Sequence, residues 1–199
     1  MVLLLFVLHT NLEFQHLISK IRWRCRFCFS FGVMNEAPPE GFRIRTIEAR
    51  DESALAGIIR ATLEEFGANH PGTVYDDPST KHLFEVFKRD RSIYFVAEQN
   101  GHIVGGAGVF PSKGLPPGTC ELVKMYLLPE ARGKGLGRQL IDSCFSFAKE
   151  QGFRFMYLET MPELKKAISI YEKLGFHFLQ GPLGDTGHVG CGIWMLKEL

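Results

Sequence analysis

The sequence lacks an excess of charge, a long apolar run and a regular spacing of cysteines, and each absence excludes a class of protein. Its formal net charge is +1 over 199 residues, which argues against a dedicated nucleic-acid binder. The apolar run of residues 1–8 is far shorter than a membrane span, and no positive residue precedes it as in a signal peptide. The five cysteines are an odd number without framework spacing, which is typical of a reducing compartment. We therefore expect a cytoplasmic protein that binds neither membranes nor nucleic acids.

Residues 1–41 differ from the rest of the chain and are expected to be an N-terminal extension and linker. Basic and aromatic residues surround Cys25 and Cys28, a C-x-x-C pair that could be half of a zinc site, a redox pair or part of a membrane-surface anchor. No second Cys/His pair follows at zinc spacing, so we expect no metal site and a poorly ordered segment. The folded domain is predicted to cover residues 42–199.

A glycine-rich loop, Arg132-Gly133-Lys134-Gly135-Leu136-Gly137, lies between a strand-like and a helix-like run. The strand is expected over residues 121–128, and apolar residues recur at helical spacing over residues 136–150. Glycines allow a ligand to approach the backbone closely, and the first N–H groups of a helix lack partners within it. The helix dipole and the side chains of Arg132, Lys134 and Arg138 add positive charge. The loop is therefore predicted to bind an anion, and phosphate is the anion that such helix ends favour.

The spacing of the glycines excludes the two commonest kinds of phosphate-binding loop. It fits neither the Walker loop nor the dinucleotide fingerprint. The pattern Arg132-x-x-Gly135-x-Gly137 resembles motif A of the GCN5-related N-acetyltransferases (GNAT family), and residues 167–176 resemble that family's helix-to-strand segment A-I-x-L-Y-E-K-x-G-F. The resemblance implies that acetyl-CoA is the co-substrate and that its pyrophosphate lies on the loop. The cofactor-binding residues that it implies are Met125, Tyr126, Leu127, Arg132, Gly133, Lys134, Gly135, Leu136, Gly137 and Arg138.

Hydrophobic periodicity and turn residues predict a domain of both helices and strands. Strands are expected over residues 42–47, 93–98, 102–110, 121–128, 153–159, 176–179 and 188–196. Helices are expected over residues 52–65 (capped by Asp51), 80–88 and 136–150, and from Pro162 to Gly175. The strand, helix and strand from 121 to 159 form a β-α-β unit, so those two strands should be parallel neighbours. The resemblance implies a mixed, mostly antiparallel, twisted sheet of about seven strands with about four helices, in which the two parallel strands separate to admit the pantetheine arm.

Glu121 is the candidate general base for acetyl transfer to an amine. It lies in an apolar strand, and alternation places it on one face with Val123, Met125 and Leu127. Desolvation there should raise the pKa of the carboxyl and make it a better base. The resemblance also places Glu121 where histone-type members carry a glutamate base. The alternative is a structural ion pair with Lys124 or Arg154.

Tyr171 is the candidate general acid. It lies on the apolar stripe of its helix, so a core tyrosine is the structural alternative. In the resembling family, the tyrosine of the second motif points at the thioester sulfur and protonates the leaving thiolate. One position departs from the family pattern, because Leu164 stands where many members carry an asparagine that contacts CoA.

These residues predict an acetyl-CoA-dependent N-acetyltransferase that transfers acetyl directly to an amine in a ternary complex. The alternative is a non-catalytic acyl-CoA-binding or regulatory domain. The acceptor is expected to be a small-molecule or peptide amine, and a homodimer is compatible with the sequence. Candidate acceptor-site residues are Glu65, Tyr75, Asp76, Asp185 and His188.

Overall fold

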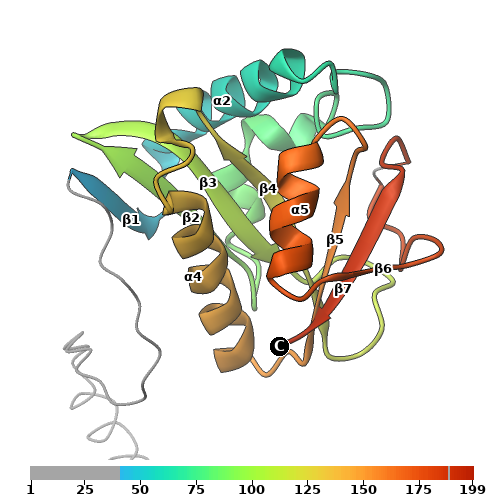
Figure 1. Ribbon diagram of the computed structural model, residues 1–199. Coiled ribbons are helices and arrows are strands. Elements are labelled where there is room, and N and C mark those ends of the chain that lie inside the picture. Colours follow the sequence, from blue (N-terminus) through green and yellow to red (C-terminus); the bar gives the residue numbers. More distant parts are fainter. Residues whose placement is uncertain (1–40, 188) are drawn as a thin grey trace, which may run out of the picture. The chain divides into compact units, whose positions relative to one another are not determined.

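The computed structural model describes residues 41–187 and 189–199, which form one seven-stranded sheet with helices on both faces (Figure 1). The predictions for residues 1–40 and for His188 lie outside the described residues. The strands are β1 (Phe42–Thr46), β2 (Ile93–Gln99), β3 (His102–Phe110), β4 (Thr119–Leu127), β5 (Phe155–Thr160), β6 (His177–Phe178) and β7 (Ile193–Glu198). The helices are α2 (Glu52–Glu65), α3 (Leu83–Val86), α4 (Leu136–Glu150) and α5 (Lys165–Lys173), with short 3-10 turns η1 (Ala49–Asp51), η2 (Pro78–Lys81) and η3 (Pro129–Ala131).

The strand order is β1-β2-β3-β4-β5-β7-β6, and β4–β5 is the parallel pair in this sheet. This topology confirms the predicted mixed sheet and its parallel β-α-β unit. The Asn100-Gly101 turn joins β2 to β3, with positive φ at both residues, as the hairpin signal predicts.

Two apolar clusters cover the two faces of the sheet. Under α4 and α5, which stand in front of the sheet in Figure 1, the buried side chains include Leu136, Leu140, Ile141, Cys144, Met156 and Leu174. On the opposite face, α2 and α3 contribute Leu55, Ile59, Leu63 and Leu83, which pack against Tyr94 and Val96 of β2. No helix within the described ranges combines the length and the apolarity that a membrane crossing requires.

Three predicted element boundaries are wrong. The helix expected over residues 80–88 is broken into η2 and α3, because the amide of Phe84 binds the carboxylate of Glu52 (2.9 Å) instead of a helix carbonyl. Pro162 does not start a helix. It lies in a turn closed by Leu164 N and Met161 O (3.0 Å), and α5 begins at Lys165. The last strand runs over Ile193–Glu198 rather than residues 188–196.

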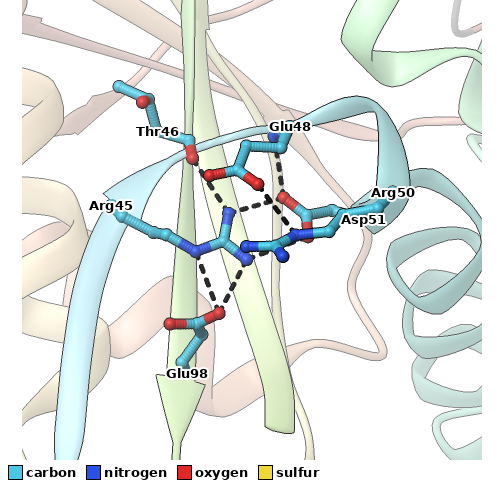
Figure 2. A network of polar contacts seen from close by, with 6 residues as sticks. All are labelled: Arg45, Thr46, Glu48, Arg50, Asp51 and Glu98. Atoms are coloured by element: carbon cyan, nitrogen blue, oxygen red, sulfur yellow. Dashed lines mark hydrogen bonds and ion pairs between the residues drawn. The ribbon is translucent and has the colours of Figure 1, made fainter. Parts of the chain in front are cut away.

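Asp51 does not cap α2 as predicted, because its carboxylate is bound elsewhere (Figure 2). It accepts hydrogen bonds from both terminal nitrogens of Arg45 (2.6 and 2.9 Å) and from the amide of Glu48 (2.7 Å). Arg45 also donates to Glu98 on β2 (2.7 Å), so the network ties β1, β2 and the start of α2 together. Burial alone would raise the pKa of Asp51, but the hydrogen bonds from Arg45 and Glu48 outweigh it, and the net effect is a lowered pKa.

A β-bulge at Lys124 reverses the side-chain alternation of β4. Lys124 has a φ of 50°, and the register with β3 shifts between Gly106 and Gly108. Before the bulge, Val123 packs against the apolar cluster under α2 and α3, whereas after it Met125 and Leu127 pack in the apolar cluster under α4 and α5. The prediction that Glu121 shares a face with Met125 and Leu127 is therefore wrong, because one inserted residue turns the strand over.

Candidate active site

The parallel strands β4 and β5 separate after a short paired section. Their pairing covers three residue pairs, from Thr119 with Phe155 to Glu121 with Tyr157. Beyond that point, a narrow cavity of about 40 Å³ lies between residues of the two strands. Its lining includes Glu121, Tyr126, Glu159, Leu164, Tyr171 and Cys191. We call this space the strand gap, and it brings the two candidate catalytic residues, Glu121 and Tyr171, to one place.

Glu121 lies where the strand gap meets a second, larger cavity of about 460 Å³, because it lines both. The residue is 3% exposed, and the hydroxyl of Ser112 donates a hydrogen bond to its carboxylate. Of the two ion-pair partners considered for Glu121, Lys124 forms an ion pair with Asp77 (2.5 Å). The other, Arg154, places its guanidinium over the ring of Phe155. The buried position of Glu121 is that expected of a desolvated base, and its catalytic role stays a prediction.

Tyr171 reaches the strand gap from α5. Its ring packs edge-on against Phe176 with centroids 5.8 Å apart, and the residue is 7% exposed. Within the described residues its hydroxyl makes no hydrogen bond. Burial raises the pKa of Tyr171 to about 12, so the phenol keeps its proton at neutral pH. A protonated hydroxyl facing the gap is what a general acid requires.

The glycine-rich loop joins η3 to the N-terminus of α4 with the geometry of an anion site. Gly133 and Gly135 have φ of 74° and 80°, and a Cβ on either would meet nothing within 4 Å. Gly135 is the N-cap residue of α4. Because it has no side chain that could accept hydrogen bonds, the first backbone amides of the helix remain available to a ligand. Gly137 has a different role, because a Cβ there would lie 3.3 Å from the Met125 side chain. The third glycine therefore lets α4 pack closely on β4.

The three cationic side chains near the loop differ in their surroundings. Arg132 donates to the carbonyl of Leu127 (2.7 Å), and both its terminal nitrogens bind Glu65 (2.6 and 2.8 Å). Arg138 pairs with Asp142 one turn along α4 (2.8 Å). Lys134 lies near the ring of Phe42 (5.3 Å) and has no acidic partner among residues 41–187 and 189–199. The residues present thus fit a phosphate group, with backbone amides and Lys134 as the available donors and Arg132 as a brace between the loop and α2.

The larger cavity is the candidate acceptor site, because it opens beside Glu121. Of the residues predicted for this role, Asp76 and Asp185 line it. Glu65 and Tyr75 are not among its lining residues, since Glu65 binds Arg132 and Tyr75 donates to Glu64 (2.7 Å). Their role in acceptor binding stays a prediction.

Sequence reasoning missed several polar residues of the site. Ser112 and Asp77 lie in loops, where no periodic pattern singles them out. Glu159 accepts hydrogen bonds from Tyr157 (2.8 Å) and Thr186 (2.7 Å) and faces the strand gap from β5. Its position two residues after Tyr157, on the strand predicted to run beside Glu121, is a signal that could have found it.

Comparisons with known proteins find similar sequences and similar folds. The model of the Acetyltransferase (GNAT) family matches residues 55–176. The uncharacterized N-acetyltransferase YjgM of Escherichia coli K12 is 41% identical over 167 residues, which cover 83% of this chain and 100% of YjgM. An acetyltransferase of the GNAT family from Staphylococcus aureus Mu50 has the same fold, with a TM-score of 0.68 and 20% identity over 79% of this chain and 99% of its own. The yncA protein of Salmonella typhimurium, solved with its cofactor acetyl-CoA, has a TM-score of 0.63 and 20% identity over 80% of this chain and 94% of its own.

Proposed function

This chain belongs to the acetyltransferase (GNAT) family, and from that premise we propose that it transfers acetyl from acetyl-CoA directly to an amine, with Glu121 as base and Tyr171 as acid. The family and the named relatives make it an acetyl-CoA-dependent N-acetyltransferase rather than a non-catalytic acyl-CoA-binding domain. The acceptor is proposed to be a small-molecule or peptide amine. The oligomeric state and a cytoplasmic location remain predictions.

The observation that carries the assignment of roles is the continuity from the glycine-rich loop to the acceptor cavity. Gly137 at the start of α4 approaches Met125 of β4, and Arg132 binds the carbonyl of Leu127. The strand gap begins beside these residues and holds Tyr171, and Glu121 lies where the gap meets the acceptor cavity. This continuity supports a path along which phosphate, thioester and amine would lie in succession.

Glu121 and Tyr171 are proposed to carry out the two proton transfers of the reaction. Acetyl-CoA supplies a thioester, an acyl group already activated for attack by an amine. Glu121, held by Ser112, is positioned to take the proton of the incoming ammonium, directly or through water. Tyr171, whose pKa is raised to about 12 by burial, retains the proton that the departing thiolate needs.

Cys191 supports direct transfer rather than an acyl-cysteine route. Its thiol lines the strand gap, where it would be the available protein nucleophile. Burial, reinforced by the charges of Glu159 and Glu121, raises the pKa of this thiol to about 12. The thiolate is the nucleophilic form, so Cys191 is almost entirely unreactive at neutral pH.

The phosphate site is tested by replacing Gly135 with aspartate. Gly135→Asp should reduce CoA affinity strongly, because it places a negative charge at the N-terminus of α4 where phosphate binds. Gly135→Asn is the matched control, since it has the same size and tolerates the same positive φ without adding charge. Calorimetry showing equal CoA affinity for folded Asp and Asn variants would remove the phosphate assignment.

The base is tested by comparing two carboxylates of the same gap. Glu121→Gln should lower turnover most near neutral pH, and the deficit should shrink as alkaline pH deprotonates the amine without help. Glu159→Gln is the control, because Glu159 binds Tyr157 and Thr186 and is assigned no proton transfer. Release of free thiol from acetyl-CoA, measured against pH with a panel of amines, gives both profiles. A pH-independent loss in Glu121→Gln, equal to that in Glu159→Gln, would contradict the assignment.

A further inference from the structure

The acceptor cavity has a continuous apolar wall. Phe87, at the end of α3, and Phe110, at the end of β3, meet edge to face with ring centroids 5.6 Å apart. Val123 of β4 extends this wall toward Glu121. A volume of about 460 Å³ lies within the usual range of small-molecule sites. An acceptor in this cavity therefore places an apolar group against the two rings.

Among the described residues, one of the three cations that line the cavity has no acidic partner. Lys124 pairs with Asp77 (2.5 Å), and Lys113 pairs with Asp185 (3.1 Å). Arg89 also lines the cavity, yet within the described ranges its guanidinium has no acidic partner. Two of the three positive charges are thus already neutralised by the protein, and the third is available to a ligand.

Arg89 contacts an aromatic ring whose residue pairs with the proposed base. Its guanidinium sits over the ring of Phe110, 5.4 Å from the centroid. Phe110 and Glu121 are directly opposite each other in the β3–β4 pair, so their side chains project to the same face of the sheet. The available cation and the base therefore flank the same aromatic ring.

We propose that the acceptor is a small primary amine that also carries a carboxylate and an apolar group, and that Arg89 binds the carboxylate. This inference rests on the function proposed above and names the acceptor class of the same site. A free amino acid with an apolar side chain has these three groups. Its ammonium would face Glu121, its side chain the Phe87–Phe110 wall, and its carboxylate Arg89.

The charge around the cavity favours a carboxylate over a phosphate. A guanidinium presents a planar pair of donors that matches a carboxylate. Acidic side chains line the same cavity, namely Asp76, Asp77, Asp185 and Glu121. A doubly charged phosphate would meet these carboxylates with a single available cation to offset it, whereas one carboxylate balances one guanidinium.

The rim of the cavity favours a small acceptor over a folded protein. Its loops are joined by backbone contacts at two pairs of glycines. The amide of Gly190 donates to the carbonyl of Gly72 (2.8 Å), and a Cβ on Gly184 would lie 2.8 Å from the backbone of Gly114. These contacts hold the loop after α2, the loop before β4 and the loop before β7 against one another. The acceptor thus enters a recess bounded by fixed backbone.

The test compares amino acids with their amides, which keep the shape and remove the negative charge. L-Phenylalanine, L-leucine and their amides are offered to the wild type, Arg89→Gln, Arg89→Lys and Lys88→Gln, with thiol release and mass spectrometry of the product as readouts. Expressing each variant relative to the wild type, acceptor by acceptor, cancels the difference in amine basicity between acid and amide.

The wild type should prefer the acids, and Arg89→Gln should lower kcat/KM for the acids by about ten-fold, mainly through KM, while leaving the amides within about two-fold. Arg89→Lys should recover part of the loss. Lys88→Gln should change neither class, because Lys88 pairs with Glu85 and does not line the cavity. Equal effects of Arg89→Gln on acids and amides would overturn the inference, as would a wild type that acetylates neutral amines or polyamines but no amino acid. A wild type that neither binds CoA nor releases thiol with any amine would overturn the proposed function, and this inference with it.

Discussion

Replacing Tyr171 with phenylalanine should separate catalysis from stability. The substitution removes one oxygen that makes no hydrogen bond within the described residues, and it keeps the ring that packs on Phe176 at 5.8 Å. The free energy of unfolding should therefore change by less than about 1 kcal/mol, the net worth of a typical hydrogen bond. Turnover should fall by about 10²–10⁴-fold, or roughly 3–5 kcal/mol of barrier, the usual contribution of a positioned general acid.

The pH dependence provides a second measurement of the same residue. With a pKa of about 12, Tyr171 is ionised in roughly one molecule in 10⁵ at pH 7. The wild-type kcat should therefore show no alkaline decline from this residue below about pH 11. The assays are thiol release against pH, urea unfolding, and calorimetry with CoA, whose affinity should be unchanged in the variant.

Tyr157→Phe is the matched control for this experiment. Tyr157 is another buried tyrosine beside the gap, but its hydroxyl donates to Glu159 (2.8 Å) and accepts from the amide of Leu183 (3.2 Å). Its loss should cost about 1–3 kcal/mol of stability because it leaves buried groups unsatisfied, with a smaller effect on turnover. The reasoning is refuted if Tyr171→Phe keeps turnover within two-fold, or if its activity falls only in proportion to CoA affinity.

Asp51→Asn should lower the free energy of unfolding by about 3 kcal/mol, because it leaves Arg45 mostly buried without its main counter-charge. The folded-state pKa of Asp51 is lowered, so the ionised carboxylate stabilises the wild type fully above the unfolded-state pKa of about 4. This contribution to the free energy of unfolding is lost as the pH falls further. Urea unfolding measured at a series of acidic pH values should show the loss in the wild type and not in the variant. Gly105→Ala should destabilise the protein by about 2–4 kcal/mol, because the new Cβ would lie 2.2 Å from the carbonyl oxygen of Tyr126 at a φ of 153°. Gly57→Ala lies in the interior of α2 with open space around it, so it should instead stabilise the protein by about 0.5–1 kcal/mol. A thermal melt that ranks these two variants in the opposite order would contradict the packing described here.

The parts of the structure that local sequence signals specify were predicted correctly. The hairpin at Asn100-Gly101 depends on its own two residues, and α4 follows from its apolar stripe and the glycines before it. The parallel placement of β4 and β5 follows from the chain order of strand, helix and strand. The family resemblance then supplied roles for Glu121 and Tyr171, which the fold places in one gap.

The parts that depend on distant partners were missed or wrong. The prediction that Asp51 caps a helix was wrong, because its carboxylate binds Arg45, which also binds Glu98 on the neighbouring strand. No local sequence pattern shows these contacts. Glu65 was assigned to the acceptor site, yet its carboxylate binds a guanidinium 67 positions later in the chain. Much of the lining of the acceptor cavity comes from loops, where hydrophobic periodicity gives no information.

The bulge at Lys124 changes which positions of β4 serve each face of the sheet. Before it, the odd-numbered residues Glu121 and Val123 line the acceptor cavity, whereas after it the odd-numbered residues Met125 and Leu127 pack toward the helix that carries the glycine-rich loop. The even-numbered residues exchange faces in the opposite sense, since Leu122 packs with that helix and Tyr126 packs in the apolar cluster under α2 and α3. Substitutions at Val123 should therefore alter which amine is accepted, whereas substitutions at Met125, two positions later, should act on the support of the phosphate site.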